Sequence, residues 1–269
     1  MRSIMSTKAS VICLGLWAAS CHAEPALALA GENMGPQSAQ AAVSAGLPGP
    51  RDEFPRRANF KLESASPAAR QTADWVVDSD NNRGLPFVIL DKSQARVFVF
   101  HGNGQLRGAA AALIGSAVGD DSVPGIGERT LASMLPEERT TPAGRFVAAL
   151  DHNLHGKPML WVDYESAISM HPVITTNPQE RRAERLATPT PLDNRISYGC
   201  INVPAEFFRR VVSPAFKASN GVVYVLPETR SAQQVFASYD VDERARQQAE
   251  NRRSSAPVTS QIDTDSVRR

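Results

Sequence analysis

Short apolar runs separated by glycine- and proline-containing turns are the feature that most constrains the fold of this chain. Runs rich in Val, Ile and Phe are typical of strands. They cover residues 87–90, 95–100, 145–150, 159–162, 167–171 and 222–226. Helical patterns are confined to a few segments, such as one that Ser66 and Pro67 would open and one that follows Pro204. Gly102-Asn103-Gly104 predicts a tight hairpin turn, and residues 115–127 predict a surface loop. We therefore expect a mainly β domain, a sandwich or barrel with a few peripheral short helices.

The two ends of the chain differ from this middle part. Arg2 and Lys8 precede an apolar stretch at residues 9–19 and small residues follow it, so residues 1–23 predict a signal peptide. We expect a flexible Ala/Pro/Gly-rich spacer at 24–64, the folded domain at 65–230 and a polar tail at 231–269, partly helical or disordered. The apolar stretch is shorter than a membrane span, which favours a periplasmic or secreted protein. Alternatively, Cys21 lies at a weak lipoprotein cleavage site and would carry a lipid anchor.

The charge balance excludes one class of partner. Removing residues 1–23 leaves 27 Lys and Arg against 28 Asp and Glu, so the mature chain is nearly neutral. Nucleic-acid binding needs a concentrated basic surface, so we expect no nucleic-acid partner.

Cys200 stands out because Cys13 and Cys21 both fall within the predicted export signal. A lone thiol in an oxidising compartment requires either burial or a chemical role. Cys-x-x-Cys motifs, paired histidines and a Gly-rich strand-to-helix turn do not accompany it, so we expect neither a metal site nor a nucleotide cofactor.

A catalytic thiol needs a base, and His171 is the best candidate. His101, His152 and His155 lie in polar turns and are most simply solvated. His171 ends a predicted strand, on the same face as the small side chains of Ala167 and Ser169, which leave room for a thiol or a substrate. A structural, hydrogen-bonded histidine at a strand end is the alternative interpretation.

With His171 and the run Ser197-Tyr198-Gly199-Cys200-Ile201-Asn202, the chain resembles the L,D-transpeptidases with a YkuD-like catalytic domain. The resemblance extends over about residues 85–228. It includes Asp91-Lys92 and the segment Thr141-Pro142-Ala143-Gly144-Arg145-Phe146. It implies a β-rich L,D-transpeptidase fold, a location in the periplasm or at the cell surface, and peptidoglycan stem peptides as substrate.

The resemblance also implies a mechanism. His171 would activate Cys200, which would attack the carbonyl of the L-centre at the third stem residue and form a thioester. Backbone N–H groups of Tyr198, Gly199 and Cys200 would stabilise the oxyanion. Ser197, Asn202 and Arg195 would bind substrate or support the loop. An acceptor amine on another stem, a lipoprotein lysine or a free D-amino acid would resolve the thioester.

Two alternatives stay open at this point. Water as acceptor would make the protein an L,D-carboxypeptidase. The second alternative is a catalytically impaired wall-binding protein. It rests on Tyr198, which stands where the family usually has a second histidine.

The interval from His171 to Cys200 is longer than is usual in that family. Asn177 and Glu180 have capping-box spacing around Pro178, which predicts a short helix that ends before Pro189. Arg181, Arg182 and Arg185 would share one side of it and could bind the carboxylates of a stem peptide. The alternative is a solvated helix whose arginines pair with its own glutamates.

Overall fold

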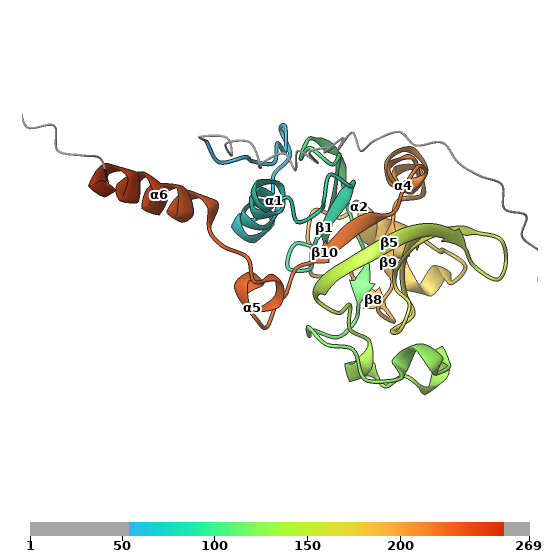
Figure 1. The fold of residues 1–269 in the computed structure, drawn as a ribbon. Helices are drawn as coiled ribbons and strands as arrows, with labels where there is room; N and C mark the ends of the chain where they lie inside the picture. The colour runs from blue at the N-terminus through green and yellow to red at the C-terminus, as the bar shows by residue number, and fades with distance from the viewer. Residues whose placement is uncertain (1–53, 256–269) are drawn as a thin grey trace, which may run out of the picture. The chain divides into compact units, whose positions relative to one another are not determined.

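A computed structural model describes residues 54–255, and its main feature is one eight-stranded sheet (Figure 1). The sheet has the order β3-β2-β1-β10-β5-β6-β7-β9, and β4 pairs separately with β8. The strands are β1 (Phe87–Asp91), β2 (Arg96–Phe100), β3 (Leu106–Ala111), β4 (Ile114–Gly115), β5 (Gly144–His152), β6 (Pro158–Asp163), β7 (Ile168–Pro172), β8 (Arg195–Ser197), β9 (Ile201–Val203) and β10 (Gly221–Val225). All the strands expected from the sequence are present, and the expectation of a mainly β fold is confirmed.

The two ends of the sheet come close to closing into a barrel. Leu113, just after β3, forms an isolated bridge with Asn202 in β9, with an N–H···O distance of 2.8 Å in each direction. Most neighbouring strands are antiparallel, but β1 pairs with β10 and β7 pairs with β9 in parallel. The parallel pair of β7 and β9 is the one that brings the predicted site together.

Both faces of the β1, β2 and β10 region are buried, and the side chains alternate between two apolar clusters. In β1, for example, Val88 and Leu90 belong to one cluster, while Phe87 and Ile89 belong to the other. This is the side-chain alternation of an extended strand. Because both faces are covered, these strands are continuous apolar runs in the sequence.

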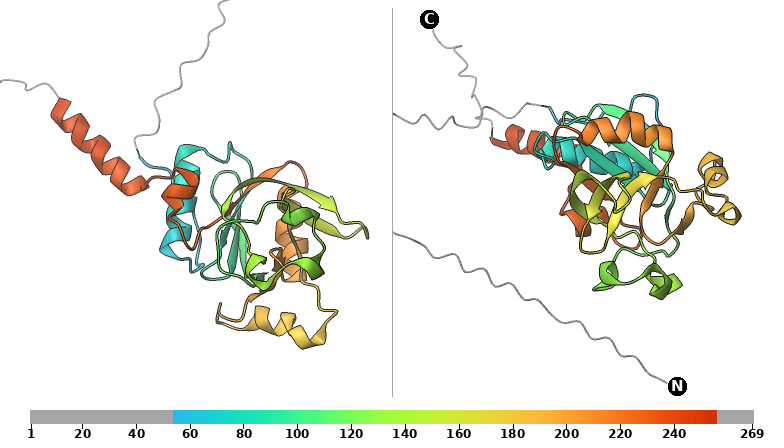
Figure 2. Two further views of the ribbon diagram at one scale, coloured as in Figure 1. Left: turned by 90° about the horizontal axis from the view of Figure 1, so that it is seen from below. Right: turned by 90° about the vertical axis from the view of Figure 1, so that its right-hand side faces the viewer.

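The described residues also form helices, most of them short. They are α1 (Pro67–Ser79), α2 (Arg182–Ala187), α3 (Ala205–Phe207), the π-helix η5 (Phe208–Val212), α4 (Ser213–Phe216), α5 (Ala232–Phe236) and α6 (Val241–Ser255). The 3₁₀ turns are η1 (Ile126–Glu128), η2 (Leu131–Ser133), η3 (Pro136–Glu138) and η4 (Pro178–Glu180). The α1 helix packs on one face, and the continuous α3-η5-α4 segment packs on the other (Figure 2).

Local sequence signals explain where these helices begin. The side chain of Ser66 accepts a hydrogen bond from the N–H of Ala69, and Pro67 occupies the first turn of α1, as expected. The helix predicted after Pro204 is longer than the sequence suggested, because it continues through a π-turn to Phe216.

The folded part of the chain is wider than residues 65–230. Phe60, within the expected spacer, is buried in the α1 cluster and packs edge-on against Phe98 and Phe100. From the expected polar tail, Phe236 and Val241 also join this cluster. These apolar side chains are isolated in polar sequence, so composition alone did not reveal their burial.

Two local predictions need correction. Residues 115–127 are not simply a surface loop, because Gly115 lies in β4 and Asp120 is buried. The helix expected from Pro178 onward is instead η4 followed by α2, and Arg181 separates them with φ +50°. Asn177 does cap the first turn, by accepting a hydrogen bond from the N–H of Gln179 at 3.1 Å.

Other predictions fall outside the described residues. These are the signal peptide at 1–23, the lipid anchor at Cys21, most of the spacer and the last residues of the tail. Within residues 54–255, no helix combines the length and apolar character that crossing a bilayer requires.

Candidate active site

Cys200 lies at the end of a tight turn that joins β8 to β9. Ser197, the last residue of β8, holds this turn with its hydroxyl group. The hydroxyl donates to the carbonyl oxygen of Cys200 at 2.6 Å and accepts from the N–H of Gly199 at 3.1 Å. The predicted role of Ser197 in loop support is therefore consistent with its contacts.

Gly199 is required in this turn for two reasons. Its φ of +126° is a conformation that L side chains rarely adopt. A Cβ atom here would also lie 2.7 Å from the carbonyl oxygen of Thr140 and 2.8 Å from Cδ1 of Ile168. The carbonyl oxygen of Gly199 accepts a hydrogen bond from Oγ1 of Thr141 at 2.8 Å, which fixes the turn against the chain that precedes β5.

His171 reaches the site from β7, which runs parallel to β9 with His171 opposite Asn202. Its Nδ1–H donates to the carbonyl oxygen of Pro172 at 2.8 Å, which leaves Nε2 as the ring nitrogen able to exchange a proton with another group. The imidazole lies close enough to the thiol of Cys200 for each group to shift the pKa of the other. The strand register therefore brings together the two residues that the sequence paired.

The thiol has two further neighbours, both on β7 or just before it. Sγ of Cys200 lies 3.7 Å from Oγ of Ser169 and 3.7 Å from the carbonyl oxygen of Ala167. The sequence placed Ala167 and Ser169 on the face of His171 but did not identify them as thiol contacts. The side-chain alternation of the strand was the signal for their position.

The electrostatics of the pair favour the thiolate. Burial would raise the pKa of the Cys200 thiol, but the hydrogen bond and charge of His171, with help from Ser169, lower that pKa below its usual value. Burial would likewise lower the pKa of His171, but the hydrogen bond and charge of Cys200 raise it. The pair therefore shifts toward a thiolate next to an imidazolium, which is the state that attacks a carbonyl.

Asn202 connects this pair to the insertion between β7 and β8. Its side-chain amide donates to the carbonyl oxygen of Cys200 at 3.2 Å, and its Oδ1 accepts from Nη1 of Arg182 at 3.0 Å. Arg182 is largely buried and also pairs with Glu180. The positive charge of Arg182 opposes the rise in the pKa of His171.

Arg181 and Arg185 do not point into the same site as Arg182. Arg181 is exposed and pairs with Glu184, whereas Arg185 donates to the backbone carbonyl oxygens of Glu180 and Asp193. All three arginines therefore have partners within the chain. Their contacts favour the alternative of internal pairing, and their predicted binding of a substrate carboxylate stays a prediction.

Arg195 supports a neighbouring loop. Its guanidinium donates to the carbonyl oxygens of Gly115 and Ala117 at 3.4 and 3.2 Å and pairs with Glu228. Because β8 leads directly into the turn of Cys200, this pairing fixes the approach to the site.

Lys92 holds a buried polar network beneath the same loop, which the sequence did not predict. Its Nζ donates to the carbonyl oxygen of Gly119 at 2.5 Å, to Oδ1 of Asp120 at 2.9 Å and to the carbonyl oxygen of Thr141 at 3.0 Å. Burial would raise the pKa of Asp120, but hydrogen bonds from Lys92 and Thr229 and from nearby backbone N–H groups lower it strongly. The network joins the start and the end of residues 117–140, which we call the covering segment.

The covering segment carries η1 to η3 and closes one side of a small cavity beside Cys200. The cavity has a volume of about 80 Å³. Its walls include Ile126, Arg129, Met134 and Glu138 from the covering segment, and Ala167, Tyr198 and Cys200 from the sheet side. Arg129 and Glu138 pair with each other at 2.8 Å at the cavity wall.

The predicted oxyanion donors differ in their availability. The N–H of Gly199 is already bonded to Ser197. Within residues 54–255, the N–H groups of Tyr198 and Cys200 make no hydrogen bond with a protein acceptor. These two N–H groups are thus the better candidates for an oxyanion hole.

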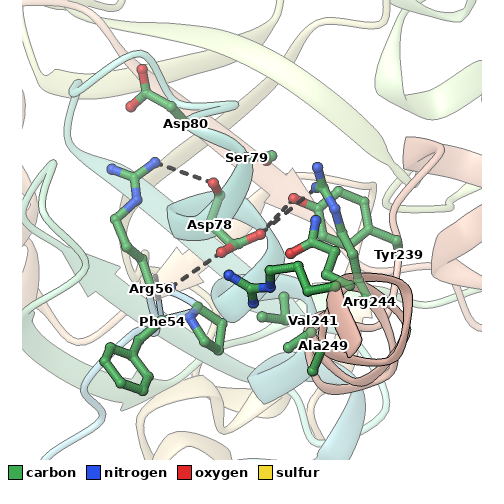
Figure 3. Close-up of a pocket in the computed structure, with 13 residues that line it drawn as sticks. Phe54, Arg56, Asp78, Ser79, Asp80, Tyr239, Val241, Arg244 and Ala249 are labelled. Atoms are coloured by element: carbon green, nitrogen blue, oxygen red, sulfur yellow. Dashed lines mark hydrogen bonds and ion pairs between the residues drawn. The ribbon is translucent and has the colours of Figure 1, made fainter. Parts of the chain in front are cut away.

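A larger cavity, of about 710 Å³, lies elsewhere, between the end of α1, the chain near Arg56 and α6 (Figure 3). Its centre is Asp78, which accepts from the N–H of Arg56 at 3.1 Å and the hydroxyl of Tyr239 at 2.7 Å and forms an ion pair with Arg244. Because Asp78 is already bonded to Arg56, Tyr239 and Arg244, we assign no ligand to this cavity. In the part of the chain that the structure describes, no cluster of three His, Cys, Asp or Glu side chains could hold a metal ion.

Comparisons with known proteins add little beyond this geometry. No family model and no curated protein matches the chain. Among solved structures, the chain is similar to the L,D-transpeptidase LdtMt1 in complex with imipenem, at 14% identity, with a TM-score of 0.30 and coverage of 52% of this chain and 58% of that chain. It is also similar to an L,D-transpeptidase from Xylanimonas cellulosilytica, at 13% identity, with a TM-score of 0.34 and coverage of 53% and 60%.

A third similar structure is the catalytic domain of the L,D-transpeptidase from E. faecium, at 15% identity, with a TM-score of 0.32 and coverage of 53% of this chain and 98% of that chain. The chain thus spans less than two thirds of the first two structures. TM-scores this low do not establish a family.

Proposed function

We propose that this protein is a peptidoglycan L,D-transpeptidase that uses Cys200 as its nucleophile. The observation that carries the proposal is the pairing of Cys200 with His171 across β7 and β9, which lowers the pKa of the thiol. The sequence of the turn and its resemblance to the L,D-transpeptidase motif supply the substrate class, a stem peptide with an L-centre at its third residue.

The reaction begins when the thiolate of Cys200 attacks the carbonyl carbon of the third stem residue. The N–H groups of Tyr198 and Cys200 donate to the oxyanion, and one such donor is worth about 3 kcal/mol. His171 then donates its proton to the leaving nitrogen, the peptide bond breaks and the terminal D-amino acid departs. The product of this half is a thioester on Cys200.

In the second half of the reaction, His171 acts as a base instead of an acid. An acceptor amine attacks the thioester, His171 removes the proton of that amine, and the thiolate leaves. A new peptide bond forms without ATP, because the thioester conserves the energy of the bond that was cleaved. Outside the cytoplasm, where we expect this protein, such conservation makes cross-linking possible.

The first experiment asks whether Cys200 forms an acyl-enzyme. We expect intact-protein mass spectrometry to show one covalent adduct after incubation with a carbapenem, and none in C200A. S93A is a suitable control, because Ser93 lies in the turn between β1 and β2 and contacts Asp91 rather than the site. A folded wild-type protein that forms no adduct contradicts the proposal and favours a non-catalytic wall-binding protein.

The second experiment identifies the reaction. Purified sacculi incubated with the enzyme are digested and their muropeptides are weighed. Cross-linked dimers indicate transpeptidation, whereas tripeptide stems without dimers indicate the L,D-carboxypeptidase reaction with water. Exchange of the terminal residue indicates a free D-amino acid as acceptor.

A further inference from the structure

Tyr198 occupies the motif position at which the resembled family usually has a histidine, and the structure gives it a specific partner. Cζ of Arg139 lies 4.2 Å from the centroid of the Tyr198 ring, which is a cation–π contact. Tyr198 also lines the cavity beside Cys200. The aromatic ring is therefore both a wall of the cavity and the point to which Arg139 binds.

Arg139 lies near the end of the covering segment and connects the rest of that segment to the ring of Tyr198. Its Nη2 donates to the carbonyl oxygen of Met134 at 3.0 Å, and Met134 is buried and lines the same cavity. Its backbone carbonyl oxygen accepts from the N–H of Ala117 at 3.1 Å, which closes the base of the segment. The guanidinium thus lies between the covering segment and the catalytic turn and contacts both.

The size of the cavity shows why this contact matters. About 80 Å³ is far below the roughly 300–1,000 Å³ of pockets that hold small-molecule ligands. The sheet-side wall is fixed by β7 and the hydrogen-bonded turn, whereas the opposite wall consists of short 3₁₀ turns. A stem peptide can enter only when the covering segment moves, and the Arg139–Tyr198 contact opposes that movement.

We propose that Tyr198 is a positioning residue that, through Arg139, holds the covering segment over Cys200 and limits the size of the group that reaches the thiol. This inference builds on the proposed function because it treats Cys200 as the nucleophile. Its test does not depend on acyl transfer, since it needs only the thiol.

The test compares alkylation of Cys200 by a small haloacetamide and by a bulky N-aryl maleimide on the full chain. Peptide mass mapping assigns the modification to Cys200 rather than to Cys13 or Cys21. We expect Y198L and R139Q each to raise the ratio of the bulky to the small rate about tenfold, which corresponds to about 1.4 kcal/mol. Y198F keeps the aromatic ring and should retain the wild-type ratio.

Two comparisons separate this role from general destabilisation. R244Q removes a matched cation–π pair, since Cζ of Arg244 lies 4.3 Å from the ring of Tyr239 away from the cavity, and it should leave the ratio unchanged. The double variant Y198L/R139Q should resemble either single variant, because both remove the same contact. If Y198L does not fold, the alkylation ratio of R139Q alone tests the proposal.

Three results would overturn the proposal. They are an unchanged ratio in a folded R139Q, additive effects in the double variant, and a Y198F variant that behaves as Y198L. A protein that forms no carbapenem adduct but shows the expected ratios would refute the proposed function and leave this inference standing.

Discussion

The thiol of Cys200 is held by contacts from three directions. Ser169 and Ala167 approach its sulfur from β7 and the turn before it, the imidazole of His171 supplies the opposing charge, and the carbonyl of its own residue is bound by Ser197 and Asn202. Fixing both the sulfur and the backbone limits the freedom of the nucleophile. Such pre-organisation favours attack from a single geometry.

This arrangement predicts how the reactivity of Cys200 changes with pH. A free cysteine has a pKa of about 8.5, so the lowered pKa should move the midpoint of the haloacetamide alkylation profile below that value. In H171Q the imidazolium is absent, and the midpoint should rise toward or above that of a free thiol. The measurement is the second-order alkylation rate at Cys200 from pH 5 to 10.

The raised pKa of His171 also affects the pH dependence of Cys200 alkylation. The raised pKa of His171 means that the imidazolium persists above its ordinary titration range and is lost as the pH rises through the raised value. H155Q is the control, because His155 is an exposed loop residue. An H171Q profile identical to that of the wild type would show that His171 does not activate the thiol.

At the level of elements, the parallel pairing of β7 with β9 is what makes the site. Residues 171 and 200 are far apart in the sequence, and the insertion with η4 and α2 lies between them. The sequence predicted β7 and singled out the residues of the turn, but it did not predict β8 or β9, and no periodicity specifies which strands become neighbours. Before the structure, His171 was linked to Cys200 by its place at the end of a predicted strand, among histidines otherwise in polar turns, and by the resemblance to a family motif.

The covering segment was predicted poorly for a related reason. Its attachment to the domain depends on the burial of Lys92 and Asp120, two charged residues that sequence patterns normally place at the surface. Their mutual pairing and the backbone partners around them make the burial possible. The sequence around Asp120 contains no pattern that indicates its partner Lys92, which lies 28 residues earlier.

We expect K92M to destabilise the protein by about 3 kcal/mol, the low end for breaking a buried ion pair, because it leaves the buried carboxylate of Asp120 with only Arg230, at 3.7 Å, as a cation. Urea unfolding at neutral pH gives this difference. K157M removes an exposed lysine and should change the unfolding free energy little. A K92M variant as stable as K157M would show that the network does not hold the segment.

The pH dependence of that difference follows from the direction of the Asp120 shift. A lowered pKa in the folded state contributes stability above the unfolded value of about 3.9 and loses it as the pH falls through the folded value. The gap between the wild type and K92M should therefore be widest above about pH 4 and shrink on further acidification.

At the scale of the whole described chain, one sheet supports two apolar clusters, one on each face. The sequence predicted six of the strands because runs of Val, Ile and Phe are strong signals, but it missed the short or Ala/Gly-rich strands β3, β4, β8 and β9. It predicted the borders of the domain less well, because single residues such as Phe60 and Phe236 join the α1 cluster from polar stretches. A lone aromatic residue in a polar stretch has no periodicity from which its burial could be read.

The shared strands predict that both faces unfold together. Phe236 stacks on Trp75 with ring centroids 6.1 Å apart and meets Tyr224 edge-on at 5.8 Å. We expect F236A to lower the free energy of unfolding by about 2 kcal/mol, below the roughly 3–5 kcal/mol of a fully buried phenylalanine, since Phe236 is only partly buried. For a chain of this size, the corresponding fall in Tm is about 5 °C.

The informative measurement is whether the catalytic turn unfolds at the same lowered temperature as the α1 face. In a W17F/W161F background, the fluorescence of Trp75 reports on the α1 face, and alkylation of Cys200 during heating reports on the catalytic turn. Because β1, β2 and β10 contribute to both clusters, the two midpoints should fall together in F236A, as they do in a two-state transition. L154A removes a fully exposed side chain and should leave both midpoints unchanged. If F236A lowered only the fluorescence midpoint, the α1 face would be a separate cooperative unit, and the turn of Cys200 would owe its order to the β7–β9 pairing alone.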